Sequence, residues 1–204
     1  MMSPMTTHRG TGTLRLLAVL AVGLSATTAC ASGNPATAYR AMPSVSSAAP
    51  TAGLAQPYQS PDGYSIRPPI GWVPRPGNGQ DGRSAAYTAP AVDRANPKAF
   101  AMDLTIVVRP VTADLQTLVD QAKEQTPRTL VAYQVVTDKP VMANGLPGHL
   151  LGGTYDDRGD PRENLQLLVV NTGKVYTVTF TGPASRFASL HDLALASMSS
   201  FTVS

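Results

Sequence analysis

Cysteine is almost absent from this chain, which has only Cys30 among its 204 residues. A single cysteine cannot form an internal disulfide, so the covalent support of many small secreted domains is excluded and packing must hold the fold. Charged residues are also few, at 14%, and they form no runs. A formal net charge of +3 without a basic patch argues against a nucleic-acid partner.

A long hydrophobic run is missing as well. The best candidate, residues 16–24 (LLAVLAVGL), is too short for a membrane span, which needs roughly 20 apolar residues. It follows an acid-free stretch that carries Arg9 and Arg15, and it precedes small residues that end at Ala29. This order predicts a secretory signal peptide over residues 1–29. Its removal leaves 14 basic against 13 acidic side chains.

Cys30 follows the predicted signal directly. Residues 28–33 (TACASG) resemble the lipobox of bacterial lipoproteins, in which the cysteine sulfur receives a diacylglyceryl group and cleavage occurs before the cysteine. Thr27 departs from that pattern, where leucine is usual, and this bears on how efficiently the chain is processed. The resemblance implies a palmitate-type anchor at Cys30 and a place on the extracytoplasmic face of the cell membrane. The alternative is a plain secreted protein with a chance cysteine at this position.

Residues 30–61 are rich in Ala, Ser, Thr and Pro, and Arg40 is their only charged side chain. They show no apolar periodicity, and such a composition buries too little surface to offset the entropy of ordering. We therefore expect a disordered tether with a root-mean-square reach of roughly 30 Å. The tether would hold the folded part clear of the membrane.

Residues 62–204 have the patterning of one folded domain. Alternating apolar residues over 99–109 (AFAMDLTIVVR) predict a strand that Pro110 ends. The period changes to that of a helix over residues 114–126, closed by Pro127, and again over residues 185–200. Further strands are predicted at 63–73 (interrupted by two prolines), 84–89, 131–138, 141–143 and 147–156, and a hairpin at 163–171 with 174–181 around the turn NTG. Two helices against an antiparallel sheet give the α+β class.

The same order of elements resembles the PsbP-like α/β/α sandwich. Its markers here are Gly71-Trp72, residues 146–148 (LPG), residues 152–155 (GGTY) and Phe201. Within that fold, residues 62–204 resemble the actinobacterial LpqN/LpqT lipoprotein group. The resemblance implies a fold and an envelope location, and an accessory, assembly or binding role rather than an enzymatic one.

Catalytic and metal-binding patterns are scarce. His149 and His191 have no zinc-site spacing, and no second cysteine accompanies Cys30, so neither a metal nor a cofactor is predicted. There is no Gly-x-Ser-x-Gly elbow and no phosphate-binding glycine motif. The acidic segment 156–160 (DDRGD) lacks the spacing of a calcium loop and is best interpreted as a polar turn. The pair Gly152-Gly153 indicates a bend or a close approach of another backbone.

Trp72, the only tryptophan, lies among Pro68, Pro69 and Pro74 and is expected to cover the core, or alternatively to line a ligand groove. We expect a non-enzymatic, membrane-anchored factor of the cell envelope that binds an apolar ligand or an envelope protein. A hydrolase of envelope lipids or esters and a purely structural secreted protein are the alternatives.

Overall fold

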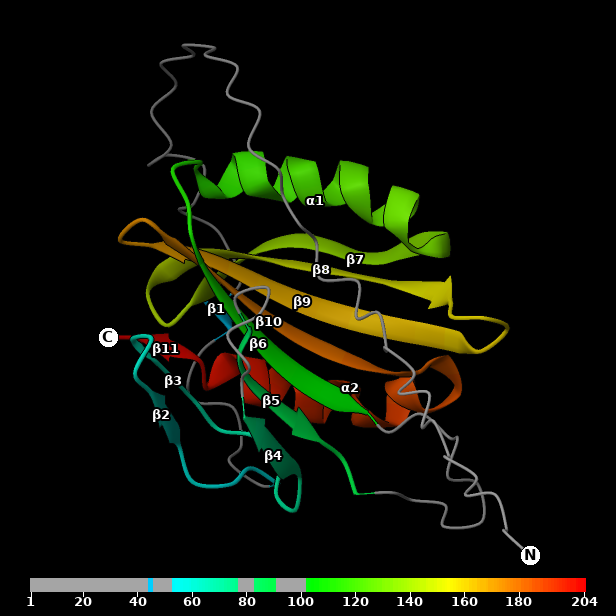
Figure 1. Ribbon diagram of the computed structural model, residues 1–204, viewed down its shortest axis with the longest axis horizontal. Helices are drawn as coiled ribbons and strands as arrows, with labels where there is room; N and C mark the ends of the chain where they lie inside the picture. Colours follow the sequence, from blue (N-terminus) through cyan, green and yellow to red (C-terminus); the bar gives the residue numbers. More distant parts are fainter. Residues whose placement is uncertain (1–43, 46–52, 77–82, 91–101) are drawn as a thin grey trace, which may run out of the picture.

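The computed structural model describes residues 44–45, 53–76, 83–90 and 102–204 (Figure 1). An eight-stranded sheet has the order β1-β7-β8-β9-β10-β6-β5-β4, and its described pairs are antiparallel except for β1 with β7. Its strands are β1 (Ser44–Val45), β4 (Val73–Pro76), β5 (Arg83–Thr88), β6 (Asp103–Pro110), β7 (Val131–Ala143), β8 (Leu146–Asp156), β9 (Pro161–Asn171) and β10 (Lys174–Pro183). A small sheet of order β11-β3-β2 contains β2 (Tyr58–Ser60), β3 (Tyr64–Ile66) and β11 (Thr202–Val203).

The two helices, α1 (Leu115–Thr129) and α2 (Ala184–Ser199), cover opposite faces of the large sheet (Figure 1). Consecutive residues of β8 show this division, because Leu150 belongs to the main core on the α2 side and Leu151 packs with α1. Side chains of a strand alternate between the two faces, so a strand covered on both sides is apolar at both parities. The α+β sandwich with two helices is thus confirmed.

The main core lies between the large sheet, α2 and the small sheet. It is dominated by aromatic and branched side chains that are almost fully buried. Its largest members are Tyr64, Tyr176, Phe180, Phe187, Phe201, Ile66, Leu104, Ile106, Leu150, Leu165, Leu167 and Met198. The cluster under α1 is much smaller and consists of Leu115, Val119, Ala122, Leu151 and Leu168, with Val170 packed against it. Helix α1 therefore depends on few apolar contacts.

Helix α1 begins at a capping residue. The Asp114 carboxylate accepts a hydrogen bond from the backbone N–H of Thr117 at 2.8 Å, and this bond lowers the pKa of Asp114. The prediction that Pro127 closes the helix is wrong, since the helix continues to Thr129. A proline in the last turn removes only one internal hydrogen bond, and the N–H of Leu130 still donates to the carbonyl of Thr126 at 2.9 Å.

The predicted hairpin is confirmed as β9 and β10. Its two-residue turn places both Thr172 (φ 46°) and Gly173 (φ 72°) in the left-handed region, as a tight turn matched to the strand twist requires. Strand β7 differs from the prediction, because it runs unbroken through Pro140 instead of dividing there. Proline is tolerated at that position since β7 lies next to the sheet edge and pairs fully only with β8.

Folded structure starts earlier than the predicted boundary at Asp62. Leu54 is buried and β2 starts at Tyr58, both within the segment 30–61 that we assigned to the tether. Near its end, that segment has two large apolar residues, Leu54 and Tyr58. Two such residues do not define the alternating pattern from which a strand is predicted. The predicted signal peptide (residues 1–29) and residues 30–43 and 46–52 of the predicted tether lie outside the described residues. Within the described part, no helix is both long and apolar enough to cross a membrane.

Candidate functional site

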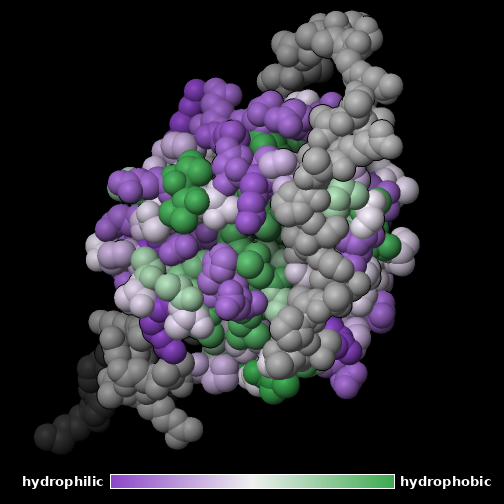
Figure 2. All heavy atoms as spheres, turned by 180° about the vertical axis from the view of Figure 1, so that it is seen from behind, coloured by the Kyte–Doolittle hydropathy of each residue, from purple (hydrophilic) through white to green (hydrophobic). Residues whose placement is uncertain are grey.

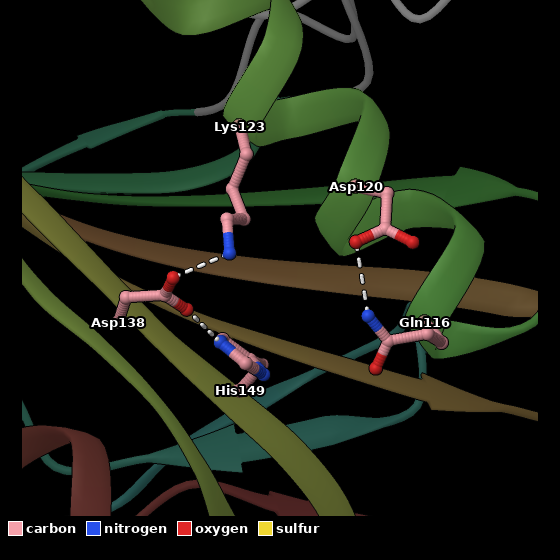
Figure 3. A network of polar contacts seen from close by, with 5 residues as sticks. All are labelled: Gln116, Asp120, Lys123, Asp138 and His149. Atoms are coloured by element: carbon pink, nitrogen blue, oxygen red, sulfur yellow. Dashed lines mark hydrogen bonds and ion pairs between the residues drawn. The ribbon is translucent and has the colours of Figure 1, made fainter.

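Three ionisable side chains from three elements meet beside helix α1 (Figure 3). Nζ of Lys123 on α1 lies 2.5 Å from Oδ2 of Asp138 on β7. The other carboxylate oxygen of Asp138 lies 2.7 Å from Nε2 of His149 on β8. Asp138, on β7, therefore contacts both helix α1 and strand β8 through one carboxylate. We call these three residues the Asp138 network.

The local folding of each element explains this meeting. Lys123 lies at the exposed flank of α1 next to the buried Ala122, and its side chain extends from the helix toward Asp138 on the sheet (Figure 3). Asp138 lies directly across from Leu151 in the β7–β8 pairing, on the face that α1 covers. His149 is two residues before Leu151 and therefore shares that face.

Burial differs across the network. The side chain of His149 is 11% exposed, that of Asp138 is 30% exposed and that of Lys123 is 44% exposed. The pKa of the Asp138 carboxyl lies below its usual value, first because Lys123 donates a hydrogen bond to it and second because His149 does. The pKa of Lys123 is raised by the same hydrogen bond from the other side. The ionised forms of Asp138 and Lys123 therefore support each other.

A histidine held by a carboxylate is also the base and orienting group of many hydrolases. Such a pair needs a nucleophilic hydroxyl on the free imidazole nitrogen. In the contacts of the described residues, the His149 ring is joined to Asp138 and to no hydroxyl group. Nearby, Gln116 donates to Asp120 at 3.0 Å on the exposed side of α1, separate from the network (Figure 3). The arrangement supports a structural link between helix and sheet.

The other histidine is remote from this network. His191 lies on α2, on the opposite side of the large sheet, with Nδ1 3.6 Å from Oδ1 of the exposed Asp192. The structure thus does not bring His149 and His191 together. Over the described ranges, no three of the metal-binding residue types are grouped to hold an ion.

Trp72 precedes β4 and is half-buried. Its ring lies 5.0 Å from that of Phe180, centre to centre, with the planes at 47°, and it packs against the main core. Offset and tilted contacts of this kind stabilise a core beyond the area they bury. Trp72 thus covers the core, which is the first of the two roles expected for it. Ligand binding by Trp72 stays a prediction. Cys30 lies outside the described residues.

The acidic segment 156–160 is a turn between β8 and β9. Asp157 and Asp160 exchange backbone hydrogen bonds, and the Asp156 carboxylate accepts the N–H of Gly159 at 2.6 Å. Asp160 and Asp157 both face the buried guanidinium of Arg162, at 2.6 Å and 3.8 Å, so a cation of the chain itself neutralises them. The interpretation as a polar turn agrees with this geometry.

Gly153 permits a close approach between β7 and β8. A methyl group on Gly153 would lie 2.4 Å from the carbonyl oxygen of Gln134 and 2.6 Å from the ring of Tyr133. The half-buried ring of Tyr133 lies against this position, and this partial burial raises the pKa of its phenol to about 12. The close approach expected of the Gly152-Gly153 pair is thus present at Gly153.

A second polar cluster joins the small sheet to β5. The hydroxyl of Tyr64 donates to Oγ of Ser84 at 3.0 Å, and Ser84 in turn donates to the carboxylate of Asp62. Sequence reasoning missed this cluster because its members come from separate segments without a shared motif. It lies beside a group of tyrosines, where burial raises the pKa of Tyr87 to about 12. We interpret it as the joint between the two sheets.

Solved structures of similar fold include one from a cyanobacterium and one from a mycobacterium. The solution structure of cyanobacterial PsbP (CyanoP) from Synechocystis sp. PCC 6803 has a TM-score of 0.55 at 17% identity, covering 77% of this chain and 96% of that one. The crystal structure of LpqN, involved in cell envelope biogenesis of Mycobacterium tuberculosis, has a TM-score of 0.58 at 17% identity, covering 73% and 90%. These similarities confirm the PsbP/LpqN-like fold that the sequence resemblance implied.

No curated protein sequence matches the chain. The model of the DcrB family matches residues 91–200, which is more than half of the sequence. That match spans the large sheet from the approach to β6 onward and both helices. The chain therefore belongs to the DcrB family.

Proposed function

We propose that this protein is a lipoprotein of the bacterial cell envelope, anchored through Cys30, and that its folded domain is a non-enzymatic accessory or binding module. The observation that carries the proposal is the order of basic, apolar and small segments that ends at Cys30. The only thiol of the chain stands where lipidation would consume it. Two or three acyl chains give stable anchoring, whereas one chain gives only marginal binding.

The accessory role has independent support from chemistry and from fold. Among the described residues, the only histidine–carboxylate pair with a short contact is committed to Lys123 and the helix–sheet joint. The neighbour LpqN is described as involved in cell envelope biogenesis. Fold alone does not transfer a function, so this similarity adds weight to an envelope role without naming its target.

Metabolic labelling with a palmitate analogue tests the anchor. We expect the full chain to incorporate label and to fractionate with membranes, and Cys30→Ala to lose both properties. Thr27→Leu provides a matched second variant, because it restores the usual lipobox residue and should raise the labelled fraction or leave it unchanged. Equal labelling of wild type and Cys30→Ala would contradict the proposal.

The accessory role needs its own experiment. The full chain with Cys30→Ala carries no covalent lipid, so any lipid extracted from the purified protein is a bound ligand. Mass spectrometry of that extract should show one apolar species near equimolar amounts if the domain is a lipid-binding module. A lipid-free protein would instead favour an envelope protein as its target.

A hydrolase is the competing function, and the pairing of His149 with Asp138 is the observation in its favour. A fluorophosphonate probe labels an activated serine covalently. We expect no labelling of the purified protein. Labelling that disappears in His149→Ala, while that variant remains folded, would overturn the non-enzymatic assignment and favour the hydrolase.

A further inference from the structure

A tight turn just before β4 presents an apolar side chain to solvent. The backbone N–H of Trp72 donates to the carbonyl of Pro69 at 3.3 Å, and Gly71 between them has φ 79°. This bond, with a positive φ at the third position, is that of a type II turn. A methyl group on Gly71 would meet nothing within 4 Å, so the turn borders open space. Ile70, at the second position, is 64% exposed.

The base of this turn is fixed by the start of the described segment 53–76. The N–H of Ile70 donates to the carbonyl of Gly53 at 2.8 Å. The buried Leu54 forms a β-bridge with Pro69, which is buried as well. The backbone beneath Ile70 is therefore held by hydrogen bonds and packing, and the exposure of its side chain is a property of the fold.

The exposed apolar surface continues into β4. Val73 is 57% exposed, and Pro74 and Pro76 are exposed too. Single exposed apolar residues need no explanation, but these four lie within seven residues of chain. The turn and β4 lie at the lower end of the described part, away from α1 (Figure 1), and hydrophobic residues reach the surface at that end (Figure 2). We call residues 70–76 the β4 tip.

Two arginines accompany the tip. Arg75 is exposed and Arg67 is partly exposed, and neither takes part in an ion pair within the described part. No acidic residue occurs over residues 63–76. Apolar side chains beside unpaired basic ones match the surface of a membrane with anionic lipids, where basic groups bind headgroups and apolar groups enter the acyl boundary.

The exposed valines of β7 fit that chemistry less well. Val131 pairs with Asp156 across the β7–β8 ladder, and Val136 lies two residues before Asp138. Carboxylates at such positions repel an anionic surface. On the β4 side, by contrast, Asp103 lies two strands in from Val73.

The predicted anchor and the tip can reach one membrane. Strand β1 fixes residues 44–45 beside the end of β7, and the chain then returns to Gly53 beside the turn. At roughly 3.5 Å per residue, the chain from Val45 to Gly53 spans at most about 28 Å, whereas the chain from Cys30 to Ser44 extends to about 49 Å. The chain before β1 is therefore long enough for a lipid at Cys30 and the tip to lie in the same surface.

We propose that the β4 tip is a docking surface for an anionic lipid bilayer, with Ile70 and Val73 in the interface and Arg67 and Arg75 on lipid phosphates. The domain then lies against the membrane, whereas the tether alone would leave it clear. The contact is small, and a tether raises its effective concentration. This strengthening rests on the proposed anchor at Cys30, whereas the choice of surface does not.

The only tryptophan reports the docking. Trp72 lies in the turn next to Val73, and lipids brominated on their acyl chains quench an indole only at near contact. Protein extracted from membranes is reconstituted into vesicles of phosphatidylcholine and phosphatidylglycerol, with or without bromine. We expect brominated vesicles to lower the emission of Trp72 at least 1.5-fold. Equal emission in the two kinds of vesicle would overturn the proposal.

A matched pair of valines tests the surface. Val73→Asp should reduce the quenching to less than 1.1-fold, whereas Val136→Asp, at a valine 60% exposed on β7, should leave it as in the wild type. Ile70→Ser is a second variant at the tip, without an added charge, in case Val73→Asp disturbs β4, and urea denaturation checks that each variant is folded. Quenching that persists in both tip variants, or that is lost equally in Val136→Asp, would contradict the docking surface.

The lipid class and the competing occupant have their own controls. Vesicles of phosphatidylcholine alone should give less quenching, as should Arg75→Gln in the mixed vesicles, and equal quenching would overturn the recognition of anionic lipid. Gel filtration tests a second copy as the occupant. If Ile70→Ser turns a dimer into a monomer and leaves the quenching unchanged, the tip binds protein and the proposal fails.

The anchor is measured on the same reconstituted sample. The mass of the N-terminal peptide shows whether Cys30 carries a lipid. Quenching that Val73→Asp removes in a chain without that lipid would refute the anchor and leave the docking surface standing. A lipidated chain without quenching would refute the docking surface and leave the anchor standing.

Discussion

Oδ1 of Asp138 lies 2.7 Å from Nε2 of His149, and the second oxygen of the same carboxylate lies 2.5 Å from Nζ of Lys123. One side chain thus satisfies a nearly buried imidazole on β8 and a cation on α1. Within this network, Lys123 provides the link to α1, whereas the contact of Asp138 with His149 joins the neighbouring strands β7 and β8.

Removing the charge of Asp138 should lower the stability of the domain, mainly through its contact with His149. For Asp138→Asn we expect a decrease in the free energy of unfolding of about 1–2 kcal/mol, since the buried imidazole loses a charged acceptor and the exposed ion pair with Lys123 contributes little. Urea denaturation provides the measurement. Asp192→Asn is the control, because Asp192 is fully exposed beside His191, and its change should stay below about 0.5 kcal/mol.

The stability difference between wild type and Asp138→Asn should depend on pH. The pKa of Asp138 is lowered in the folded state, so its contribution to stability is complete above the unfolded value of about 3.9 and is lost as pH falls through the folded value. The difference in unfolding free energy between wild type and Asp138→Asn should therefore be constant just above pH 5 and shrink below about pH 4. A difference that stays constant down to pH 2.5 would show that the charge of Asp138 is not stabilising.

Gly153 should not accept a side chain. In Gly153→Ala the methyl group would meet the Gln134 carbonyl and the Tyr133 ring, and we expect a loss of about 2–3 kcal/mol from displaced backbone. Gly159→Ala is the comparison, because Gly159 has φ 85° but nothing within 4 Å, so only the backbone conformation costs about 1 kcal/mol. Thermal unfolding followed by circular dichroism would compare the two variants, and similar losses would argue against a steric role for Gly153.

Substitution of Trp72 tests whether its ring stabilises the domain by covering the core. Trp72→Ala should lower stability by about 2–3 kcal/mol, because the half-buried indole packs on Phe180, and Trp72→Phe should recover most of that loss. As Trp72 is the only tryptophan, its fluorescence in the wild type should change on unfolding as one transition together with the circular dichroism. A Trp72→Ala protein of unchanged stability would favour a ligand-binding role for this residue.

Local signals in the sequence predicted much of the fold. The turn around Thr172 and Gly173, between two alternating runs, located the β9–β10 hairpin because both positions need the left-handed region. The period of Leu115, Leu118 and Val119 located α1. Family resemblance, rather than periodicity, supplied the way the layers are arranged.

The errors arose where tertiary context decides. Pro140 looked like a strand end, but an edge position allows it to remain inside β7. The strand that contains Tyr58 was not predicted because it has only three residues, which is too short to show an apolar period, although its partner Ile66 lies nearby in the sequence. The Asp138 network could not be predicted from sequence, since Lys123 reaches Asp138 only after α1 has docked on the sheet.

The central claim is that Cys30 is the lipidated first residue of the mature protein. Mass spectrometry of the N-terminal peptide from membrane-extracted protein tests it most directly. The account predicts a peptide that begins at Cys30 and carries a diacylglyceryl thioether, with no detectable free thiol. A mature protein that retains residues before Cys30, or that begins elsewhere with an unmodified thiol, would contradict the account.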